Sequence, residues 1–437
     1  MPPVYSSSEN TILKEIAHQN GGALSRNMQV VSTQTQSIGT ICCMLPISRL
    51  TFCTSSLVMA PIASPSSQLT TPTNTPFDEQ QPGGGECRKG VKYLVDAAPN
   101  MRTLPSEYIM PQPLIPSSVN AAPIPIVDLS GLDGAVERRM IAVQAISSAC
   151  AEWGFFRIIN HGIDISLMDE MLETVKGFFN LSWEEKMKYA SDDVMNPVRY
   201  GTSLNTPKKH TLVWRDYLRH FGYPIHKSFH LWPNNPPNYR FIAKAYLEEV
   251  WKLALKIAEA ISEGLGLERD YIEKSLGEGS QIVACNYYPP CPEPNRTLGL
   301  VGHSDHGGLT ILMQNDVEGL QVKHDENWVA VPHVPGTFVV NIGDYLEILS
   351  NGRYKSVEHR AIVNAEKTRI SVAAALGPEM MATVAPASPL VDEKSESKFR
   401  PIIYKDYMRY QQSTPLRGKS ALQPIMTMAN NSIAKPS

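Results

Sequence analysis

The sequence predicts an α+β protein in which helices precede a β-sandwich or β-barrel. In several segments between residues 137 and 265, apolar residues recur at three- and four-residue steps, which is the period of a half-buried helix. From residue 281 onward, short runs rich in β-branched and aromatic residues are separated by turn residues such as Pro335-Gly336 and Asn351-Gly352. Helices followed by many short strands are typical of α+β domains.

The predicted helices have buried faces or clear start signals. The longest is expected over Asn238 to Leu265, where apolar residues form a single face. The motif Ser182-Trp183-Glu184-Glu185 is a capping box, in which serine and glutamate side chains bond the free amides of a first turn. Further helices are expected at Glu137 to Cys150, Ser166 to Phe179 and Tyr404 to Gln412.

One strand is expected early in the chain and the others follow residue 280. The early strand is Gly154 to Ile159, which ends at the turn Asn160-His161-Gly162. The later strands are expected at Gln281 to Tyr288, Leu309 to Gln314, Leu320 to Lys323, Trp328 to Val331, Phe338 to Ile342, Tyr354 to Glu358 and Arg369 to Ala375.

Residues 1–87 differ in composition from the rest and are expected to form a disordered extension. They are rich in Ser, Thr, Gln and Pro, with few charges, and Pro82-Gly83-Gly84-Gly85 is typical of a flexible linker. The composition also resembles an organelle transit peptide, so we expect a cytoplasmic protein, or a plastid protein if residues 1–58 direct import. A non-functional extension is the alternative. The other divisions expected are a helical region at 88–270, a β-rich domain at 271–415 and a flexible tail at 416–437.

Charge, hydropathy and cysteine content exclude several functional classes. The net charge of the 437-residue chain is −3 and no Lys/Arg stripe occurs, so we expect no nucleic-acid partner. No apolar run reaches the ~18 residues of a membrane span, so we expect no membrane partner. The 7 cysteines have irregular spacing and form no CxxC motif, which argues against a disulfide scaffold and a structural zinc site. We expect a monomer in a reducing compartment.

The motif His303-Ser304-Asp305 is the first candidate for chemistry. In a strand, residues i and i+2 face the same side, so an imidazole and a carboxylate can approach one metal ion together. The motif alone is not specific, since a hydrogen-bonded pair near a turn has the same spacing. His359, on a second predicted strand, adds a further imidazole. Two histidines and one carboxylate leave three octahedral positions open, which suits Fe(II) that must admit a cosubstrate and O2, whereas zinc sites usually close tetrahedrally.

A second candidate site lies on the next predicted strand. Arg369 and Ser371 share one face of it, where a guanidinium can bind a carboxylate through two hydrogen bonds and the hydroxyl can add a third. An arginine on an exposed edge strand is the alternative. Tyr288 can add a phenol to the same anion, or it can be an ordinary core tyrosine.

Taken together, the motifs resemble those of a known family. In chain order they are Pro123 to Leu129, Trp153-Gly154-Phe155-Phe156, Asn160-His161-Gly162, Asn286 to Pro292, His303-Ser304-Asp305, Gly319 to Val322, Asn341 to Asp344, Ser350 to Arg360 and Arg369-Ile370-Ser371. This ordered set resembles the plant 2-oxoglutarate- and Fe(II)-dependent dioxygenases of specialised metabolism over about residues 105–415.

The resemblance implies a double-stranded β-helix (jelly-roll) core with flanking helices. It implies Fe(II) as the metal, 2-oxoglutarate and O2 as cosubstrates, and ascorbate in a supporting role. The reaction implied is hydroxylation, O-demethylation or desaturation of a small apolar plant metabolite through an Fe(IV)-oxo intermediate. The residues implied are His303, Asp305 and His359 for iron, and Arg369, Ser371, Tyr288 and Asn286 for 2-oxoglutarate.

Two positions depart from the family pattern. Six residues after Arg369, many relatives that act on flat phenolics carry a phenylalanine, whereas this chain has Ala375. Some flavonoid enzymes carry a lysine two residues before the Asn-Tyr-Tyr motif, whereas this chain has Ala284. We therefore expect a roomier, more apolar pocket and a substrate that is bulkier than a flavonoid or bound differently. The alternative is that Phe338 or Tyr217 fills the space.

Two other functional classes are weighed against the oxygenase. The first is a small-molecule-binding protein without catalysis on the same fold, which would not need both the metal triad and the Arg369-Ile370-Ser371 anchor. The second is a zinc hydrolase, for which no general base is evident near the histidine pair. His306 is expected to point away from the metal, because neighbouring residues in a strand face opposite sides.

Overall fold

A computed structural model describes residues 89–114, 123–203, 211–414, 418–419 and 421–427. The expected disordered extension at residues 1–87 lies outside this part of the chain. Within the described ranges, none of the helices combines the length and the apolar character needed to cross a bilayer.

Two β-sheets form the framework. The larger has the strand order β1-β2-β10-β7-β12-β5-β4-β3, and the smaller has the order β6-β11-β8-β9. From β5 to β12 the chain alternates between them, with β5, β7, β10 and β12 in the larger sheet and β6, β8, β9 and β11 in the smaller. This alternation confirms the predicted α+β jelly roll. The strands are β1 (Ile126–Asp128), β2 (Phe155–Ile159), β3 (Val198–Thr202), β4 (Asp216–Tyr223), β5 (Ser280–Tyr288), β6 (Leu300–His303), β7 (Leu309–Gln314), β8 (Leu320–His324), β9 (Asn327–Ala330), β10 (Phe338–Ile342), β11 (His359–Ala361) and β12 (Arg369–Gly377), with a separate pair β13 (Thr383–Val384) and β14 (Ile402–Ile403).

The helices agree with the periodicity of the sequence to within a few residues. At α5 the Ser182 hydroxyl accepts a hydrogen bond from the Glu185 amide, as the capping box predicts. Several short helices were not predicted. The α-helices are α2 (Val91–Ala97), α3 (Val136–Glu152), α4 (Ile165–Phe179), α5 (Trp183–Met187), α6 (Ile225–Ser228), α7 (Tyr239–Gly264), α8 (Tyr271–Ser275), α9 (Asp344–Leu349) and α10 (Tyr404–Ser413).

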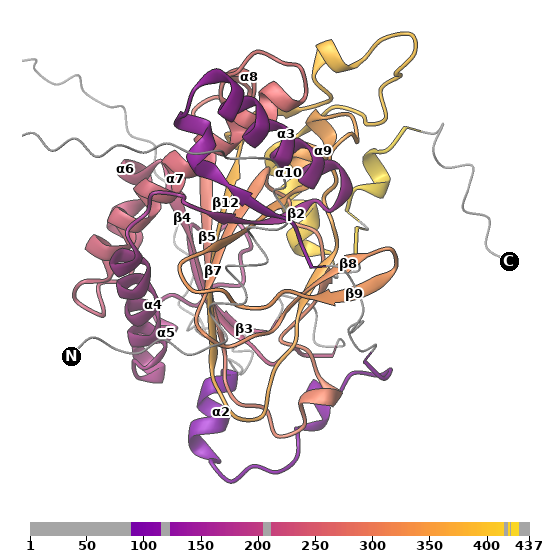
Figure 1. Cartoon of the computed structure of the whole chain (residues 1–437). Coiled ribbons are helices and arrows are strands. Elements are labelled where there is room, and N and C mark those ends of the chain that lie inside the picture. Colours follow the sequence, from indigo (N-terminus) through magenta and orange to yellow (C-terminus); the bar gives the residue numbers. More distant parts are fainter. Residues whose placement is uncertain (1–88, 115–122, 204–210, 415–417, 420, 428–437) are drawn as a thin grey trace, which may run out of the picture. The chain divides into compact units, whose positions relative to one another are not determined.

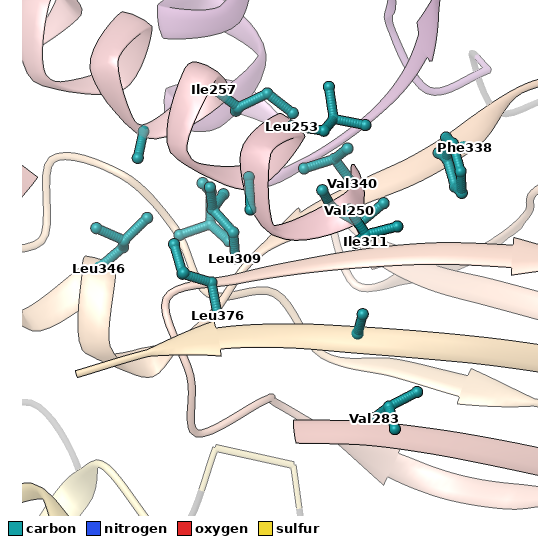
Figure 2. Close-up of a cluster of buried hydrophobic side chains, with 14 of the residues drawn as sticks. Val250, Leu253, Ile257, Val283, Leu309, Ile311, Phe338, Val340, Leu346 and Leu376 are labelled. Carbon is teal, nitrogen blue, oxygen red and sulfur yellow. The ribbon is translucent and has the colours of Figure 1, made fainter. Parts of the chain in front are cut away.

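Helix α7 covers one face of the larger sheet, beside α3 and α4 (Figure 1). The apolar side chains of α7 pack against apolar side chains at every second position of the sheet strands. Together they form the main buried core (Figure 2). Side chains labelled in this cluster include Val250, Leu253 and Ile257 of α7 and Leu309, Ile311, Val340 and Leu376 of the sheet. The opposite face of the sheet is therefore free to line a cavity.

The structure corrects the suggestion that Phe338 fills the substrate pocket. Phe338 is fully buried in the main core cluster, where its ring packs edge-on against His161. On β10, Phe338 and Val340 face the helix, so Val339 and Asn341 face the other side of the sheet. The parity of the strand therefore removes Phe338 from the cavity described below.

The N-terminal half is less helical than predicted. Strands β1 to β4 belong to the larger sheet, so a boundary at residue 270 divides this sheet rather than separating two domains. Strands β3 and β4 pair with Arg199 opposite Arg219 and Gly201 opposite Tyr217. Because these positions are polar, the strands lack the apolar alternation by which strands are predicted from sequence.

The strand expected at Tyr354 to Glu358 is wrong, since β11 begins at His359. The preceding backbone donors bond elsewhere. The Ser356 amide donates to the Glu347 carboxylate at 2.6 Å, and the Tyr354 amide donates to the Ser350 hydroxyl at 3.1 Å. These side chains accept the backbone hydrogen bonds that the carbonyls of a neighbouring strand would otherwise accept.

Part of the expected flexible tail packs on the core. Leu422 and Ile425 are buried within the main core cluster, and the Arg400 amide donates to the Ile425 carbonyl at 2.8 Å. Gly418 forms a bridge to His303, and its amide donates to the Gly302 carbonyl at 3.1 Å. The C-terminal segment therefore reaches the strand that ends at the predicted metal ligand.

Replacing Phe338 by alanine is expected to lower the free energy of unfolding by about 3–5 kcal/mol, because it leaves a cavity in a core that cannot fully collapse. Urea unfolding followed by circular dichroism measures the change. The matched control is Phe241→Ala, since Phe241 is 71% exposed and its loss should cost under about 0.5 kcal/mol. Equal effects of the two substitutions would contradict the core position of Phe338.

Candidate metal centre and cavity

Three ligand atoms converge where the smaller sheet meets the cavity. His303 ends β6 and His359 begins β11, and the two residues lie directly opposite each other in the antiparallel pair. The Oδ1 atom of Asp305 lies 3.6 Å from Nε2 of His303 and 3.7 Å from Nε2 of His359. The donor atoms of all three residues lie within 4.8 Å of one another. Two imidazoles and one carboxylate at this spacing fit a metal ion with open positions.

Asp305 lies in the turn after β6, so strand parity does not orient it as the sequence argument assumed. Its Oδ2 atom accepts hydrogen bonds from the Thr310 hydroxyl at 2.6 Å and the Asn341 amide at 2.9 Å. These donors leave Oδ1 directed at the histidines. Burial raises the pKa of Asp305, but the two nearby imidazoles and these hydrogen bonds outweigh it and hold the pKa below its usual value.

Backbone carbonyls fix the tautomers of both histidines. Nδ1 of His303 lies 2.9 Å from the Val301 carbonyl, and Nδ1 of His359 lies 3.3 Å from the Val357 carbonyl. A carbonyl can only accept, so each Nδ1 carries the proton and each Nε2 keeps a lone pair for a metal. Burial, followed by the nearby His359, lowers the pKa of His303 to about 4, which keeps its ring neutral.

The carboxylate of Asp344 lies next to the segments that carry the three ligands and accepts hydrogen bonds from them. It is fully buried and accepts hydrogen bonds from the hydroxyls of Ser304 at 3.2 Å, Ser356 at 2.6 Å and Tyr407 at 2.6 Å. The Asp344 amide donates to the Asp305 carbonyl at 2.7 Å. Asp344 therefore joins both ligand-bearing segments to α10. Burial raises its pKa to about 6. The sequence contained the motif that ends in Asp344 but gave no sign of these contacts.

A cavity of about 220 Å³ opens beside the three ligands. Residues of both sheets line it, together with residues at the end of α10. Every site residue expected from the sequence except Phe338 lies on its wall: His303, Asp305, His359, Arg369, Ser371, Tyr288, Asn286, Ala375, Ala284 and Tyr217.

The predicted carboxylate anchor comes from two neighbouring strands of the larger sheet. Arg369 lies opposite Tyr288, and Ser371 lies opposite Asn286, so all four side chains share the cavity face. Arg369 is 2% exposed, and its Nη2 donates to the Gln314 side chain at 2.7 Å. Its Nε is buried without a hydrogen-bond partner. A buried guanidinium with an unsatisfied donor fits a carboxylate ligand.

Three arginines on β3, on β4 and just before β4 were not predicted as part of the site. Arg199, Arg215 and Arg219 all line the cavity. Arg219 lies opposite Ala284, which is the position where some flavonoid enzymes carry a lysine. The expectation of a more apolar pocket therefore needs correction at this wall, since the neighbouring strand supplies cations. The motif Trp214-Arg215-Asp216-Tyr217 is similar to a family strand that borders the substrate cavity, but that likeness alone does not show that Arg219 faces inward.

His306 is buried and lines the cavity, so it is not a surface residue, and it is not among the three residues whose ligand atoms converge. It belongs to the turn after β6, so the alternation of a strand does not apply. Its Nδ1 lies 2.8 Å from the Tyr404 hydroxyl at the start of α10. Near the end of α10, the Gln411 side chain donates to the Ser304 carbonyl at 2.9 Å. Helix α10 is therefore fixed to the metal-ligand turn at both ends.

Comparisons with known proteins agree with this geometry. Residues 279–378 match the model of the 2OG-Fe(II) oxygenase superfamily, and residues 124–239 match the model described as "non-haem dioxygenase in morphine synthesis N-terminal". Protein DOWNY MILDEW RESISTANCE 6 of Arabidopsis thaliana is 47% identical over 70% of this chain and 89% of its own length. Flavanone 3-dioxygenase 2 of Oryza sativa subsp. japonica is 44% identical over 70% and 90%. The crystal structure of JOX2 in complex with 2OG, Fe and JA superposes with a TM-score of 0.71 at 37% identity, covering 78% of this chain and 98% of that one.

Replacing Asp344 by asparagine is expected to weaken iron binding about 10- to 100-fold, the usual effect of losing a support behind metal ligands. Asparagine offers one oxygen, and its NH2 group must face a hydroxyl that now donates to the carboxylate. Anaerobic Fe(II) titration measures the affinity. The control is Asp316→Asn, whose side chain is 75% exposed. An unchanged iron affinity in the Asp344 variant would show that the hydrogen bonds do not position the ligands.

Proposed function

The chain belongs to the 2-oxoglutarate- and Fe(II)-dependent oxygenases of plant specialised metabolism, and on that premise we propose a role for each wall of its cavity. The iron ligands are Nε2 of His303, Oδ1 of Asp305 and Nε2 of His359. The convergence of these three atoms within 4.8 Å is the observation that carries the proposal. Iron with 2-oxoglutarate and O2 supplies the oxidising power that removes a hydrogen atom from a substrate C–H bond.

We propose that 2-oxoglutarate is held by the end of the cavity near β5 and β12. Arg369 binds its distal carboxylate through two hydrogen bonds, and the Ser371 hydroxyl donates a third. Tyr288 and Asn286 assist from the opposite strand. The cation is already fixed by its bond to Gln314, so little side-chain entropy is lost on binding.

The substrate in this proposal is a small plant metabolite, which is hydroxylated, O-demethylated or desaturated. Tyr217, Ala284 and Ala375 form its wall, and the two alanines leave space where larger side chains occur in some relatives. The role of the chain is to hold one C–H bond near the metal and to exclude water while it reacts. A binding protein without catalysis is less well supported, since both the metal triad and the arginine anchor face the same cavity.

We further propose that the protein acts as a cytoplasmic monomer, with plastid import as the alternative if residues 1–58 act as a transit peptide. Buried free thiols at Cys150, Cys285 and Cys291 are consistent with a reducing compartment. Imaging of the full chain fused at its C-terminus to a fluorescent protein distinguishes the locations, and sedimentation distinguishes the oligomeric states.

Succinate formation tests the proposed activity directly. The full chain, loaded with Fe(II) and ascorbate under argon and then exposed to O2, is expected to convert 2-oxoglutarate to succinate, and a plant metabolite extract should accelerate it. Mass spectrometry of the extract should show a product gaining oxygen or losing CH2 or H2. Succinate formation that is independent of iron, or absent at every extract concentration, would contradict the proposal and leave the binding protein.

His359→Ala is expected to reduce succinate formation by at least about 100-fold, because it removes a ligand that no neighbouring side chain replaces. Its Fe(II) affinity should fall in anaerobic titrations. His333→Ala is the matched control, since His333 lies outside the cavity wall. Full activity in the His359 variant would exclude that residue as an iron ligand.

Arg369→Gln is expected to raise the KM for 2-oxoglutarate by about 10-fold or more, since hydrogen bonds to a charged group are worth about 1.5–3 kcal/mol. Its Fe(II) affinity should stay the same, because Arg369 does not contact the three metal ligands. Steady-state succinate assays and anaerobic iron titrations measure the two quantities. A variant whose KM is unchanged would show that the dicarboxylate binds elsewhere.

A further inference from the structure

We propose that Arg199 and Arg219 form a second anion-binding site in the cavity, which binds a carboxylate group of the organic substrate. This inference rests on the proposed function, because it takes the metal triad and Arg369 as the iron and 2-oxoglutarate sites. It adds a substrate class: a small carboxylic acid rather than a neutral molecule.

The first observation is the position of the two arginines. They lie opposite each other on β3 and β4, and both line the cavity. Arg219 is also in register with Ala284 on β5, which is in register with Ala373 on β12. The two cations therefore occupy one end of a wall whose next strands carry only small apolar side chains at this level. A substrate that lies along these strands therefore contacts apolar side chains on β5 and β12 and the two arginines on β3 and β4.

The second observation is that neither guanidinium is neutralised. Arg199 is 2% exposed and Arg219 is 7% exposed. Nε of Arg199 donates to the Ser191 carbonyl at 3.2 Å and its Nη2 to the Tyr217 hydroxyl at 3.1 Å, whereas Nη1 of Arg219 donates to the Val194 carbonyl at 3.1 Å. These acceptors are all uncharged. Among the ion pairs of the described residues, none involves either side chain, and Asp193 acts on Arg219 only at longer range.

The third observation is an unsatisfied donor. Nη2 of Arg219 is buried and has no hydrogen-bond partner. A carboxylate oxygen of a ligand in the cavity can accept a hydrogen bond from this donor. Burial, then repulsion by Arg199, lowers the pKa of Arg219 to about 10, so it remains charged at neutral pH.

The site is separate from the 2-oxoglutarate anchor. Arg369 lies four residues along β12 from Ala373, which is at the level of Arg219, so about 13 Å of strand separates the two levels. Arg219 is also two strands further across the sheet. A 2-oxoglutarate molecule held by Arg369 and the metal ligands therefore leaves Arg199 and Arg219 for another ligand.

A carboxylate suits the site better than a larger anion. The planar guanidinium fork matches the two oxygens of a carboxylate. The neighbouring Ala284 and Ala373 offer apolar surface to the rest of the molecule.

The test compares acids with their own methyl esters. The full chain with Fe(II) and 2-oxoglutarate is titrated anaerobically in a calorimeter with benzoate, phenylacetate and cyclopentylacetate, and with the three matching esters. At least one acid should bind about tenfold or more tightly than its ester, as a charge-assisted hydrogen bond predicts. Arg219→Gln should abolish this preference, and Arg219→Lys should restore part of it, because lysine keeps the charge without the planar fork.

Arg157→Gln is the matched control, since Arg157 is similarly buried and lies outside the cavity wall. It should leave the preference for acids unchanged. Esters that bind as well as acids, or the absence of binding by all six probes, would overturn the proposal. So would an equal loss of acid and ester binding in Arg219→Gln. Iron-dependent succinate formation by the unmodified protein is measured separately, so its absence would refute the proposed function instead.

Discussion

The geometry of the metal site depends on Asp305, because its two carboxylate oxygens have different partners. Oδ2 is held by Thr310 and Asn341, which belong to β7 and β10 of the larger sheet. Oδ1 faces His303 and His359, which belong to the smaller sheet. One carboxylate therefore links the two sheets at the metal position. The hydrogen bonds to Asp344 extend this link to α10, so the turn that carries Asp305 is fixed from several directions.

The second constraint is electrostatic. The cavity wall concentrates buried arginines, while the Asp305 carboxylate faces the metal position. Cations in a poorly hydrated cavity raise the free energy of the empty protein, and an anionic ligand lowers it again. The proposed roles of Arg369 on β12 and of the arginine pair on β3 and β4 rest on this same principle. An anionic ligand binds favourably at these arginines because folding has already removed water from the guanidinium groups. A preorganised site of this kind selects ligands that carry the matching charge.

Periodicity made much of the fold predictable. Helix α7 and strands β7 and β12 follow the apolar repeats of the sequence closely. The pair Arg369 and Ser371 was also predictable, because residues two apart in a strand share a face. His303 and Asp305 were identified by their spacing, although the turn geometry that orients Asp305 differs from the strand that was assumed.

The remaining features depend on contacts between distant residues. Strand β3 and the full extent of β4 were missed because their inward positions carry arginine and tyrosine, which interrupt the apolar alternation. The support given by Asp344 joins residues from 304 to 407, and no local pattern encodes it. Phe338 was named only as a side chain that could fill the pocket, and the alternation of a strand predicts two faces without saying which one meets the helix. Only the packing of α7 decides that choice.

The central claim is that one oxygen of Asp305 binds the metal while the other stays with its two hydrogen-bond donors. A crystal structure of the full chain with Mn(II) and 2-oxoglutarate under argon tests it most directly. The account predicts one metal ion bonded to Oδ1 of Asp305 and to Nε2 of both histidines, with Thr310 and Asn341 still on Oδ2 and a 2-oxoglutarate carboxylate on Arg369. A metal ion bonded to Oδ2, or 2-oxoglutarate bound to Arg219 instead, would contradict it.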